Sequence, residues 1–328
     1  MNVFILHTED KYQERGERTM KSDTWLKSEW KHFNKNRELF LLSLPAVLFK
    51  FIFNYLPLIG LVIAFKNFNY AKGLWGSDWV GLKNFKFFFT SDNAWRVTRN
   101  TILYNVSFIV LTTVIAVTFA IMMNEINRRW LKLHQTVIIL PYFLSWVVIS
   151  YVTLGFFDQT HGYLNHLLEK FGSDPVKWYQ EAKYWPFIIV LVHLWKAVGF
   201  STLIYYAGIL GIDSSYYEAA KIDGASKMQM VTKITIPLLT PLIIILFIVS
   251  VGSIFRADFG LFFFVPNDTS FLYPVTDVID TYVYRSLRVV GDIGMSTAVG
   301  LYQSVVGFIL VVFSNALVKK INSDNALW

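Results

Sequence analysis

The sequence predicts an all-α membrane protein with six transmembrane helices, and three observations lead to that fold class. Hydrophobic residues make up 54% of the 328 residues and charged residues only 16%, against about 25% charged residues in a typical soluble domain. Apolar runs long enough to cross a hydrocarbon core of about 30 Å as helices recur along the chain. Polar segments separate these runs. The chain is therefore expected to be a polytopic membrane protein.

Residues 1–38 are expected to form a cytoplasmic or interfacial N-terminal segment, followed by a six-span domain over residues 39–328. The first 35 residues are polar, carry mixed charge and lack the basic-then-apolar order of a signal peptide. Four apolar residues among lysines can share one helix face: Trp25, Leu26, Trp30 and Phe33. Such a helix would lie on the inner leaflet, and a flexible solvated tail is the alternative.

The first three spans are expected at Leu39–Phe65, Thr101–Met123 and His134–Phe157. Lys50 interrupts the first run, and a lysine at that depth should reach the interface or face a partner helix. The second is a clean apolar run of a length that crosses the bilayer. The third has Pro141 near its start, and membrane spans tolerate proline.

The last three spans are expected at Trp185–Leu210, Pro237–Val265 and Ser296–Val318. Charged residues interrupt the fourth and fifth runs: Lys196, Arg256 and Asp258. An even number of spans places both termini on the same side of the membrane. The distribution of Lys and Arg modestly favours cytoplasmic termini, although the first outer loop opposes it.

The segments between the spans differ in character. Lys66–Asn100 is rich in Phe, Trp and Gly, which predicts an ordered interfacial loop with a short helix. Asn124–Leu133 predicts a short polar turn. Asp158–Tyr184 predicts a polar loop broken by Gly and Pro, and Pro266–Met295 is polar and mixed.

Tyr217–Pro241, at the loop of residues 211–236 that joins the fourth and fifth spans, predicts two helices around a tight turn. Ser214 and Ser215 can cap the first helix, and Glu218 is expected in its first turn, where a carboxylate suits the positive helix end. Gly224 can adopt the left-handed conformation at the helix C-terminus. Ser226 can cap a second helix that runs to Pro237 and leads directly into the fifth span.

This stretch resembles the Glu-Ala-Ala (EAA) loop of ABC-type importer permeases. The matching residues are Glu218, Ala219, Ala220, Asp223, Gly224, Ala225, Ile234 and Pro237. Val231, where many members carry an aromatic, and Ile236, where Leu is more usual, depart from the pattern. The resemblance implies the type I ABC importer permease fold, with a cytoplasmic coupling helix that sits in a cleft of a separate ATPase. An ordinary cytoplasmic helical hairpin is the alternative.

Two further stretches extend the resemblance from about Leu39 to Trp328. Gly-Leu-Lys-Asn-Phe ends at Phe85, and Asp-Val-Ile-Asp-Thr-Tyr-Val-Tyr-Arg runs from Asp277 to Arg285. Together they resemble permeases of the polysaccharide- and aldouronate-type branch of sugar importers. That branch implies a second permease subunit, an ATP-binding cassette ATPase dimer, an extracellular solute-binding lipoprotein and an oligosaccharide substrate. It also implies a bacterial cell membrane.

No catalytic site is expected in the chain. It lacks a Gly-x-x-x-x-Gly-Lys-Ser/Thr loop, so ATP and Mg are expected on the partner ATPase and no cofactor on this chain. Cysteine is absent, and His161 and His166 have no acidic or Cys partner at ligand spacing, so no metal site is expected. The net charge of +7 suits anionic lipid head groups rather than nucleic acid.

Candidate functional residues fall into three groups. For coupling, Glu218 would be the polar anchor and Gly224 the turn, with Ala219 and Ala220 allowing close approach, although helix propensity alone also explains the alanines. For the substrate, polar and aromatic groups that interrupt apolar spans are candidates: Trp195, Lys196, Arg256, Asp258, Tyr302 and Gln303. For the binding protein, the candidates are Asp277, Asp280 and Arg285, and ion pairs that merely close the loop are the alternative.

Three other functions compete. An ion-coupled secondary transporter would need carboxylates within the spans, and only Asp258 clearly qualifies. A membrane-embedded glycan-processing enzyme would need paired carboxylates, and Asp277 with Asp280 is the only near pair. A scaffold subunit would not need the Glu-Ala-Ala loop.

Overall fold

The computed structural model describes residues 35–321 and Ala326, and the chain divides into two compact units at Leu61 and Val62. The N-terminal helix expected around Trp25 lies outside the described residues. In the first unit, α2 (Arg37–Lys50) continues through a π-helical turn (Phe51–Tyr55) into a 3-10 segment that starts at Leu56. None of the residues of α2 is buried. The helical stretch Arg37–Phe65 is long and apolar enough to cross a membrane, which confirms the first expected span.

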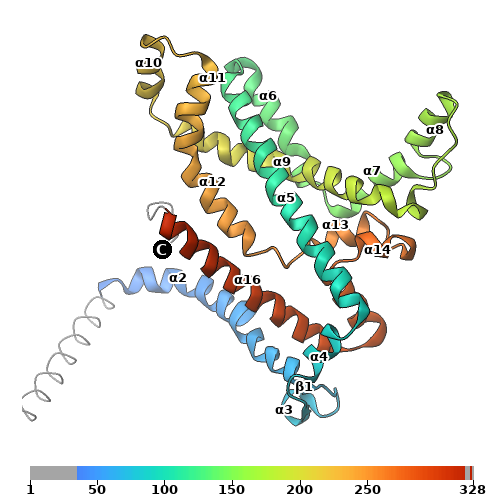
Figure 1. The fold of residues 1–328 in the computed structure, drawn as a ribbon. Coiled ribbons are helices and arrows are strands. Elements are labelled where there is room, and N and C mark those ends of the chain that lie inside the picture. The colour runs from blue at the N-terminus through green and yellow to red at the C-terminus, as the bar shows by residue number, and fades with distance from the viewer. Residues whose placement is uncertain (1–34, 322–325, 327–328) are drawn as a thin grey trace, which may run out of the picture. The chain divides into compact units, whose positions relative to one another are not determined.

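The second unit is built on long helices (Figure 1). The longest are α5 (Asp92–Glu125), α9 (Trp185–Leu210) and α16 (Ile293–Ile321). A further span runs through α11 (Lys227–Met230), a π-helical turn η6 (Val231–Thr235) and α12 (Ile236–Val251). Within residues 35–321, five helical stretches are long and apolar enough to cross a membrane, and one bent pair makes a sixth.

Among its described residues, three apolar clusters hold this unit together, and two of them are centred where α5 packs along α9. One contains Trp185, Tyr104 and Phe262, and Trp185 is completely buried. Its indole Nε1 donates to the carbonyl of Trp178 at 2.7 Å, so the ring is buried without an unpaired polar atom. The second of these two clusters contains small residues of α5, including Ala116 and Ala120. Small residues let membrane helices approach closely, which favours dispersion contacts.

The third span is broken, so the expectation of one continuous span at His134–Phe157 was wrong. Helix α6 (Arg128–Ile139) and the 3-10 turn η3 (Leu140–Phe143) are followed by α7 (Trp146–Phe157), and the two halves are bent by 98°. Pro141 lies at the start of η3. Proline lacks the N–H for the helical hydrogen bond, and its ring clashes with the preceding turn. Because α6 already begins at Arg128, the expected polar turn before it is also shorter.

The fifth span ends at Val251, so the expectation that it runs from Pro237 to Val265 was also wrong. Residues 252–257 turn, and a separate short helix α13 (Phe259–Phe264) follows. The side chain of Asp258 accepts hydrogen bonds from the N–H groups of Gly260 and Leu261 at 3.0 and 3.4 Å. Such an N-cap starts a new helix at this point.

The loop between the first two spans is ordered, as expected, but it contains a hairpin as well as short helices. β1 (Lys66–Asn67) pairs antiparallel with β2 (Asp78–Trp79) around α3 (Gly73–Gly76), and α4 (Lys83–Phe89) follows. Asn84 donates to the carbonyls of Ala64 and Lys66 at 2.9 and 3.0 Å. This asparagine therefore fixes α4 to the start of the hairpin.

The two later polar loops also contain helices. The loop of residues 158–184 carries α8 (Tyr163–Lys170), and the loop before the last span carries α14 (Tyr273–Thr276) and α15 (Ile279–Arg285). Asn165 of α8 is buried and donates to the carbonyl of Val176 at 3.0 Å. The side-chain oxygen of Asn165 accepts a hydrogen bond from the backbone N–H of Val176, also at 3.0 Å. These bonds close the loop on itself.

Candidate coupling surface and the two broken spans

The polar segment between the fourth and fifth spans begins with α10 (Ser214–Ile222). Its N-cap is Asp213, whose carboxylate accepts the N–H of Ser215 at 2.9 Å, and not Ser214 or Ser215 as expected. This hydrogen bond lowers the pKa of the Asp213 carboxyl. Because the helix begins at Ser214, Glu218 falls in the second turn, and the expectation that it lies in the first was wrong. Asp213 supplies the negative charge at the helix N-terminus instead.

The turn after α10 has the geometry that the sequence predicts. Gly224 has φ of +78°, in the left-handed region, and the N–H of Ala225 donates to the carbonyl of Ala220 at 2.9 Å. Ser226 then caps α11 in a capping box with Gln229. The helix–glycine–helix prediction is therefore confirmed. From Lys227 to Val251 the chain stays helical through η6, so the turn is joined to the span without a flexible linker.

Two side-chain contacts hold this segment against the spans. The hydroxyl of Tyr217 in α10 shares a hydrogen bond of 3.0 Å with Oγ1 of the buried Thr235 in η6. Lys227 forms an ion pair with Glu125 at the end of α5. The first contact connects α10 to the base of the α11–α12 span, and the second connects α11 to α5. The sequence offered no signal for Tyr217 beyond its place in the segment.

The surface of α10 combines a strongly exposed apolar side chain with polar ones. Ile222 is 87% exposed, and Glu218 and Ala219 on the same helix are also exposed. Asp223 and Gly224 of the turn are exposed as well, whereas Ala225 is partly buried. Pro237 lies at the first turn of α12. Sequence reasoning did not identify Ile222 as a surface residue. Its apolar side chain, two residues before Gly224 in a polar segment, was the available signal.

Lys196 of α9 closes the break in the third span. Its ammonium Nζ donates to the carbonyl of Tyr142 at 2.8 Å and also to that of Leu144. The carbonyls at the end of a helix have no intrahelical N–H partner, and in a membrane an unsatisfied carbonyl is costly. The ammonium also lies 5.1 Å from the centre of the Trp146 ring. Lys196 is therefore a cap for the break.

Trp146 connects this lysine to Asp258. Its Nε1 donates to Oδ2 of Asp258 at 2.9 Å, while Oδ1 of the same carboxylate caps α13. The indole lies against Gly260, where any Cβ would overlap the ring. The structure therefore brings Lys196 and Asp258 into one cluster. Trp146 joins them, and no local sequence pattern identified it.

A second set of polar side chains closes the break after α12. Asn105 of α5 donates to the carbonyls of Ile254 and Arg256 at 2.9 and 3.1 Å. Gln303 of α16 donates to the carbonyl of Phe255 at 2.6 Å. Asp280 of α15 accepts the N–H of Ala257 at 2.7 Å. Burial raises the pKa of the Asp280 carboxyl, and the hydrogen bond from Ala257 opposes that shift. Asn105 was missed, although an asparagine within an apolar run is a signal for such a role.

The remaining candidate substrate residues are placed differently. Nη2 of Arg256 donates to Oγ of Ser304 at 2.9 Å, and the side chain is exposed. Tyr302 packs edge-on against Phe89, with ring centres 5.0 Å apart. Trp195 neighbours Lys196 on α9 and is 45% exposed. Arg256 and Trp195 thus offer accessible surface, whereas Tyr302 contributes packing.

Asp277 and Arg285 pair with each other in the loop before α16. The carboxylate of Asp277 is 1% exposed, and it accepts from Nη2 of Arg285 and from Oγ1 of Thr281, the latter at 2.8 Å. Nη2 of Arg96 lies 3.5 Å from the second carboxylate oxygen. Arg285 also reaches Asp268 at 3.2 Å. Buried charges are normally paired in this way, and these contacts tie the loop to α5.

Comparison with known proteins identifies relatives over most of the chain. The family described as "Binding-protein-dependent transport system inner membrane component" matches residues 113–323. Protein LplB of Bacillus subtilis (strain 168) is 33% identical over 88% of this chain and 91% of its own length. The polygalacturonan/rhamnogalacturonan transport system permease protein YteP of the same organism is 31% identical over 88% and 90%.

Solved structures resemble the fold over a similar extent. The crystal structure of a bacterial ABC transporter involved in the import of the acidic polysaccharide alginate contains a chain with a TM-score of 0.81 and 30% identity. The match covers 89% of this chain and 99% of that one. The same type of transporter in complex with an alginate pentasaccharide-bound periplasmic protein gives a TM-score of 0.80 at 29% identity, covering 89% and 97%.

Proposed function

Because this chain belongs to the family of binding-protein-dependent transport system inner membrane components, we propose that it is a permease subunit of an ATP-driven importer of oligosaccharides. It forms half of the translocation pathway and is driven by a separate ATPase. ATP and Mg bind to that partner, and this chain carries out no hydrolysis itself. Relatives named for polygalacturonan, rhamnogalacturonan and alginate transport support a carbohydrate substrate.

One observation carries the coupling role. The left-handed turn at Gly224 joins the exposed helix α10 to an unbroken helical path from Lys227 to Val251. A partner that binds α10 therefore moves the fifth span directly when it moves, and the Tyr217–Thr235 contact adds a second connection. Glu218, Ala219, Ala220 and Ile222 offer the surface for that partner. Asp223, Gly224, Ala225 and Pro237 set its geometry.

The substrate path is proposed to run beside the two broken spans. Transporter binding sites commonly form where membrane helices are interrupted, because backbone polar groups become available there. Lys196 and Asp258 meet at one break and Gln303 lies at the other. Exposed groups nearby, among them Arg256 and Trp195, can donate to sugar hydroxyls or stack on a sugar ring.

An extracellular solute-binding lipoprotein and a second permease subunit are the other proposed partners. We propose that the loop containing Asp277, Asp280 and Arg285 forms the contact surface for the binding protein. Its internal ion pairs hold the loop in place, while the neighbouring Val289 is 81% exposed. An exposed apolar side chain on an ordered loop suits a protein contact.

Co-purification tests the proposed assembly. The tagged chain is extracted from native membranes in mild detergent, and the proteins that accompany it are identified by mass spectrometry. An ATP-binding cassette ATPase and a second permease are expected. If the chain is isolated alone while uptake persists, the ATPase-driven mechanism fails. Asp258 would then be the first residue to test for ion coupling.

Ile222→Asp is expected to reduce co-purification of the ATPase at least about tenfold, because burying an isoleucine in an interface contributes roughly 1.5–3 kcal/mol. Val289→Asp is the matched control, since Val289 is almost equally exposed but lies in the loop before α16, on the proposed extracellular side. It should leave the ATPase bound. Equal losses in both variants would place the ATPase contact elsewhere.

The absence of cysteine allows a clean test of topology. We expect both termini and the Gly224 turn on the cytoplasmic side. Met228→Cys should react with a membrane-impermeant maleimide only after the cells are opened, and Ser173→Cys, in the loop after α8, should react in intact cells. The reverse pattern would invert the proposed orientation.

A further inference from the structure

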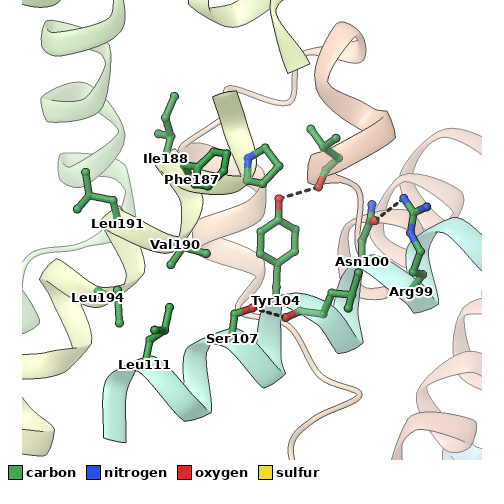
Figure 2. Close-up of a pocket in the computed structure, with 13 residues that line it drawn as sticks. Arg99, Asn100, Tyr104, Ser107, Leu111, Phe187, Ile188, Val190, Leu191 and Leu194 are labelled. Carbon is green, nitrogen blue, oxygen red and sulfur yellow. Dashed lines mark hydrogen bonds between the residues drawn. The ribbon is translucent and has the colours of Figure 1, made fainter. Parts of the chain in front are cut away.

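A groove of about 750 Å³ lies between α5 and α9, apart from the coupling surface and the broken spans (Figure 2). Six apolar side chains supply much of its wall: Leu103, Leu111, Phe187, Val190, Leu191 and Leu194. Tyr104 closes one side, and its hydroxyl donates to the carbonyl of Val275 at 3.0 Å. The groove is partly open to the surroundings, and nothing in the proposed transport cycle uses it.

One end of the groove carries an uncompensated positive charge. Nη2 of Arg99 donates to Oδ1 of Asn100 at 3.1 Å, and the side chain is exposed. Among residues 35–321, no ion pair involves Arg99, since the nearby Asp277 is enclosed by Arg285 and Arg96. The guanidinium is therefore free to bind an anion at the mouth of an apolar groove.

The groove has the depth of one membrane leaflet. Arg99 stands just before Thr101, where the apolar part of α5 begins, so it lies at the level of the head groups. From Arg99 to Leu111 the helix rises about 18 Å at 1.5 Å per residue. Half of the hydrocarbon core is about 15 Å. The apolar wall therefore extends from the interface to about the middle of the membrane.

We propose that this groove is a binding site for an anionic phospholipid. The phosphate group pairs with the guanidinium of Arg99, which is well suited to bidentate phosphate binding. One acyl chain lies between α5 and α9, along Ser107 and toward Leu111 and Leu194. The charge at one end and the apolar wall beyond it match the two parts of a lipid.

A transmembrane helix of a partner fits the groove less well. Such a helix would place apolar side chains on the guanidinium of Arg99, which has no ion-pair partner among residues 35–321, at a desolvation cost.

Photocrosslinking tests the site with a matched pair of variants. The full chain, with the subunits that accompany it, is placed in nanodiscs of phosphatidylcholine and phosphatidylglycerol with a trace of phosphatidylglycerol that carries an acyl-chain diazirine. Labelled peptides are then quantified. Ser107→Trp fills the groove, whereas Val106→Trp adds the same bulk at the same depth of α5 outside it, where Val106 is 42% exposed.

In the native chain, label is expected in the peptides that contain Leu111 and Leu194. Ser107→Trp should reduce it at least about tenfold and Val106→Trp less than about twofold. Arg99→Gln should retain labelling. In the native chain, unlabelled phosphatidylglycerol should compete for the site better than phosphatidylcholine does, and Arg99→Gln should reduce that preference about fivefold, since one cation near the surface contributes about 1 kcal/mol. Equal labelling of all exposed helices, an unchanged pattern in Ser107→Trp, or an unchanged preference in Arg99→Gln would overturn the proposal. Label on a second subunit in place of α5 and α9 would show a protein occupant and overturn it too.

Discussion

Gly224→Val is expected to reduce substrate uptake more than tenfold while the protein remains in the membrane. Gly224 has φ of +78°, and a Cβ there would meet no atom within 4 Å. The effect of substitution therefore comes from the backbone conformation alone. A β-branched residue strongly disfavours the left-handed region, at a cost of about 1–2 kcal/mol. The turn would change its conformation, and α10 would lose its orientation on the α11–α12 span.

Gly224→Asn is the matched control, because asparagine adopts the left-handed conformation more readily than other residues with a side chain. It should retain most of the uptake. Uptake of labelled oligosaccharide and the ATPase rate are measured together in proteoliposomes of the assembled importer. In the valine variant, ATP hydrolysis should continue without matching transport. If both variants transport normally, the left-handed turn has no role in coupling.

Glu218→Lys extends the same test to the partner surface. Within the described part of the chain, no hydrogen bond or ion pair involves the side chain of Glu218, so its replacement should leave the permease fold intact. Loss of uptake together with loss of the co-purified ATPase would assign the residue to that contact. Normal uptake by Glu218→Lys at normal expression would show that Glu218 has no role in coupling.

Lys196→Met is expected to reduce uptake about tenfold or more and to lower the thermal stability of the detergent-solubilised protein. Methionine keeps the length and apolar stem of lysine but removes the donors for the carbonyls of Tyr142 and Leu144. A carbonyl without a donor in the membrane has no water to replace it, and an unsatisfied acceptor away from water costs about 1–3 kcal/mol. The 98° break at Pro141 would then lose its cap, and Trp146 would lose a fixed neighbour over its ring.

The stability of the chain without substrate distinguishes a cap from a substrate ligand. If Lys196 only contacted sugar, Lys196→Met would raise KM and leave the melting temperature unchanged. Lys233→Met in η6 is the control, because Lys233 is exposed. It should change neither quantity. A normal melting temperature for Lys196→Met with a raised KM would contradict the capping role and support a direct one.

Much of the fold follows from local sequence. The first, second, fourth and sixth spans are long apolar runs, and burial of apolar surface in lipid depends mainly on composition and length. The helix–glycine–helix turn was also predictable, since Gly224 and the Ser226 capping box act within a few residues. The N-cap of α10 lies one or two residues earlier than expected, because Asp213 takes the capping position instead of Ser214 or Ser215.

The candidate site depended on distant partners. Trp146 and Asn105 escaped sequence reasoning because their hydrogen bonds reach residues 112 and 149 positions away. Asp277 and Arg285 were identified as charged, but only the fold shows that the carboxylate is enclosed and that Arg96 of α5 also faces it. A charge pattern alone does not reveal whether its neighbours are solvent or another helix.

The sequence by itself determined that this protein crosses a membrane several times and carries a helix–glycine–helix turn before its fifth span. Only the tertiary structure decided where the spans break. Pro45, Pro141 and Pro241 all lie in apolar runs, yet α2 and α12 continue through their prolines and the third span turns at Pro141. The physical reason is that a break leaves backbone carbonyls without donors. In a membrane it persists only where another helix supplies them, as α9 does here with Lys196, 54 residues from Tyr142.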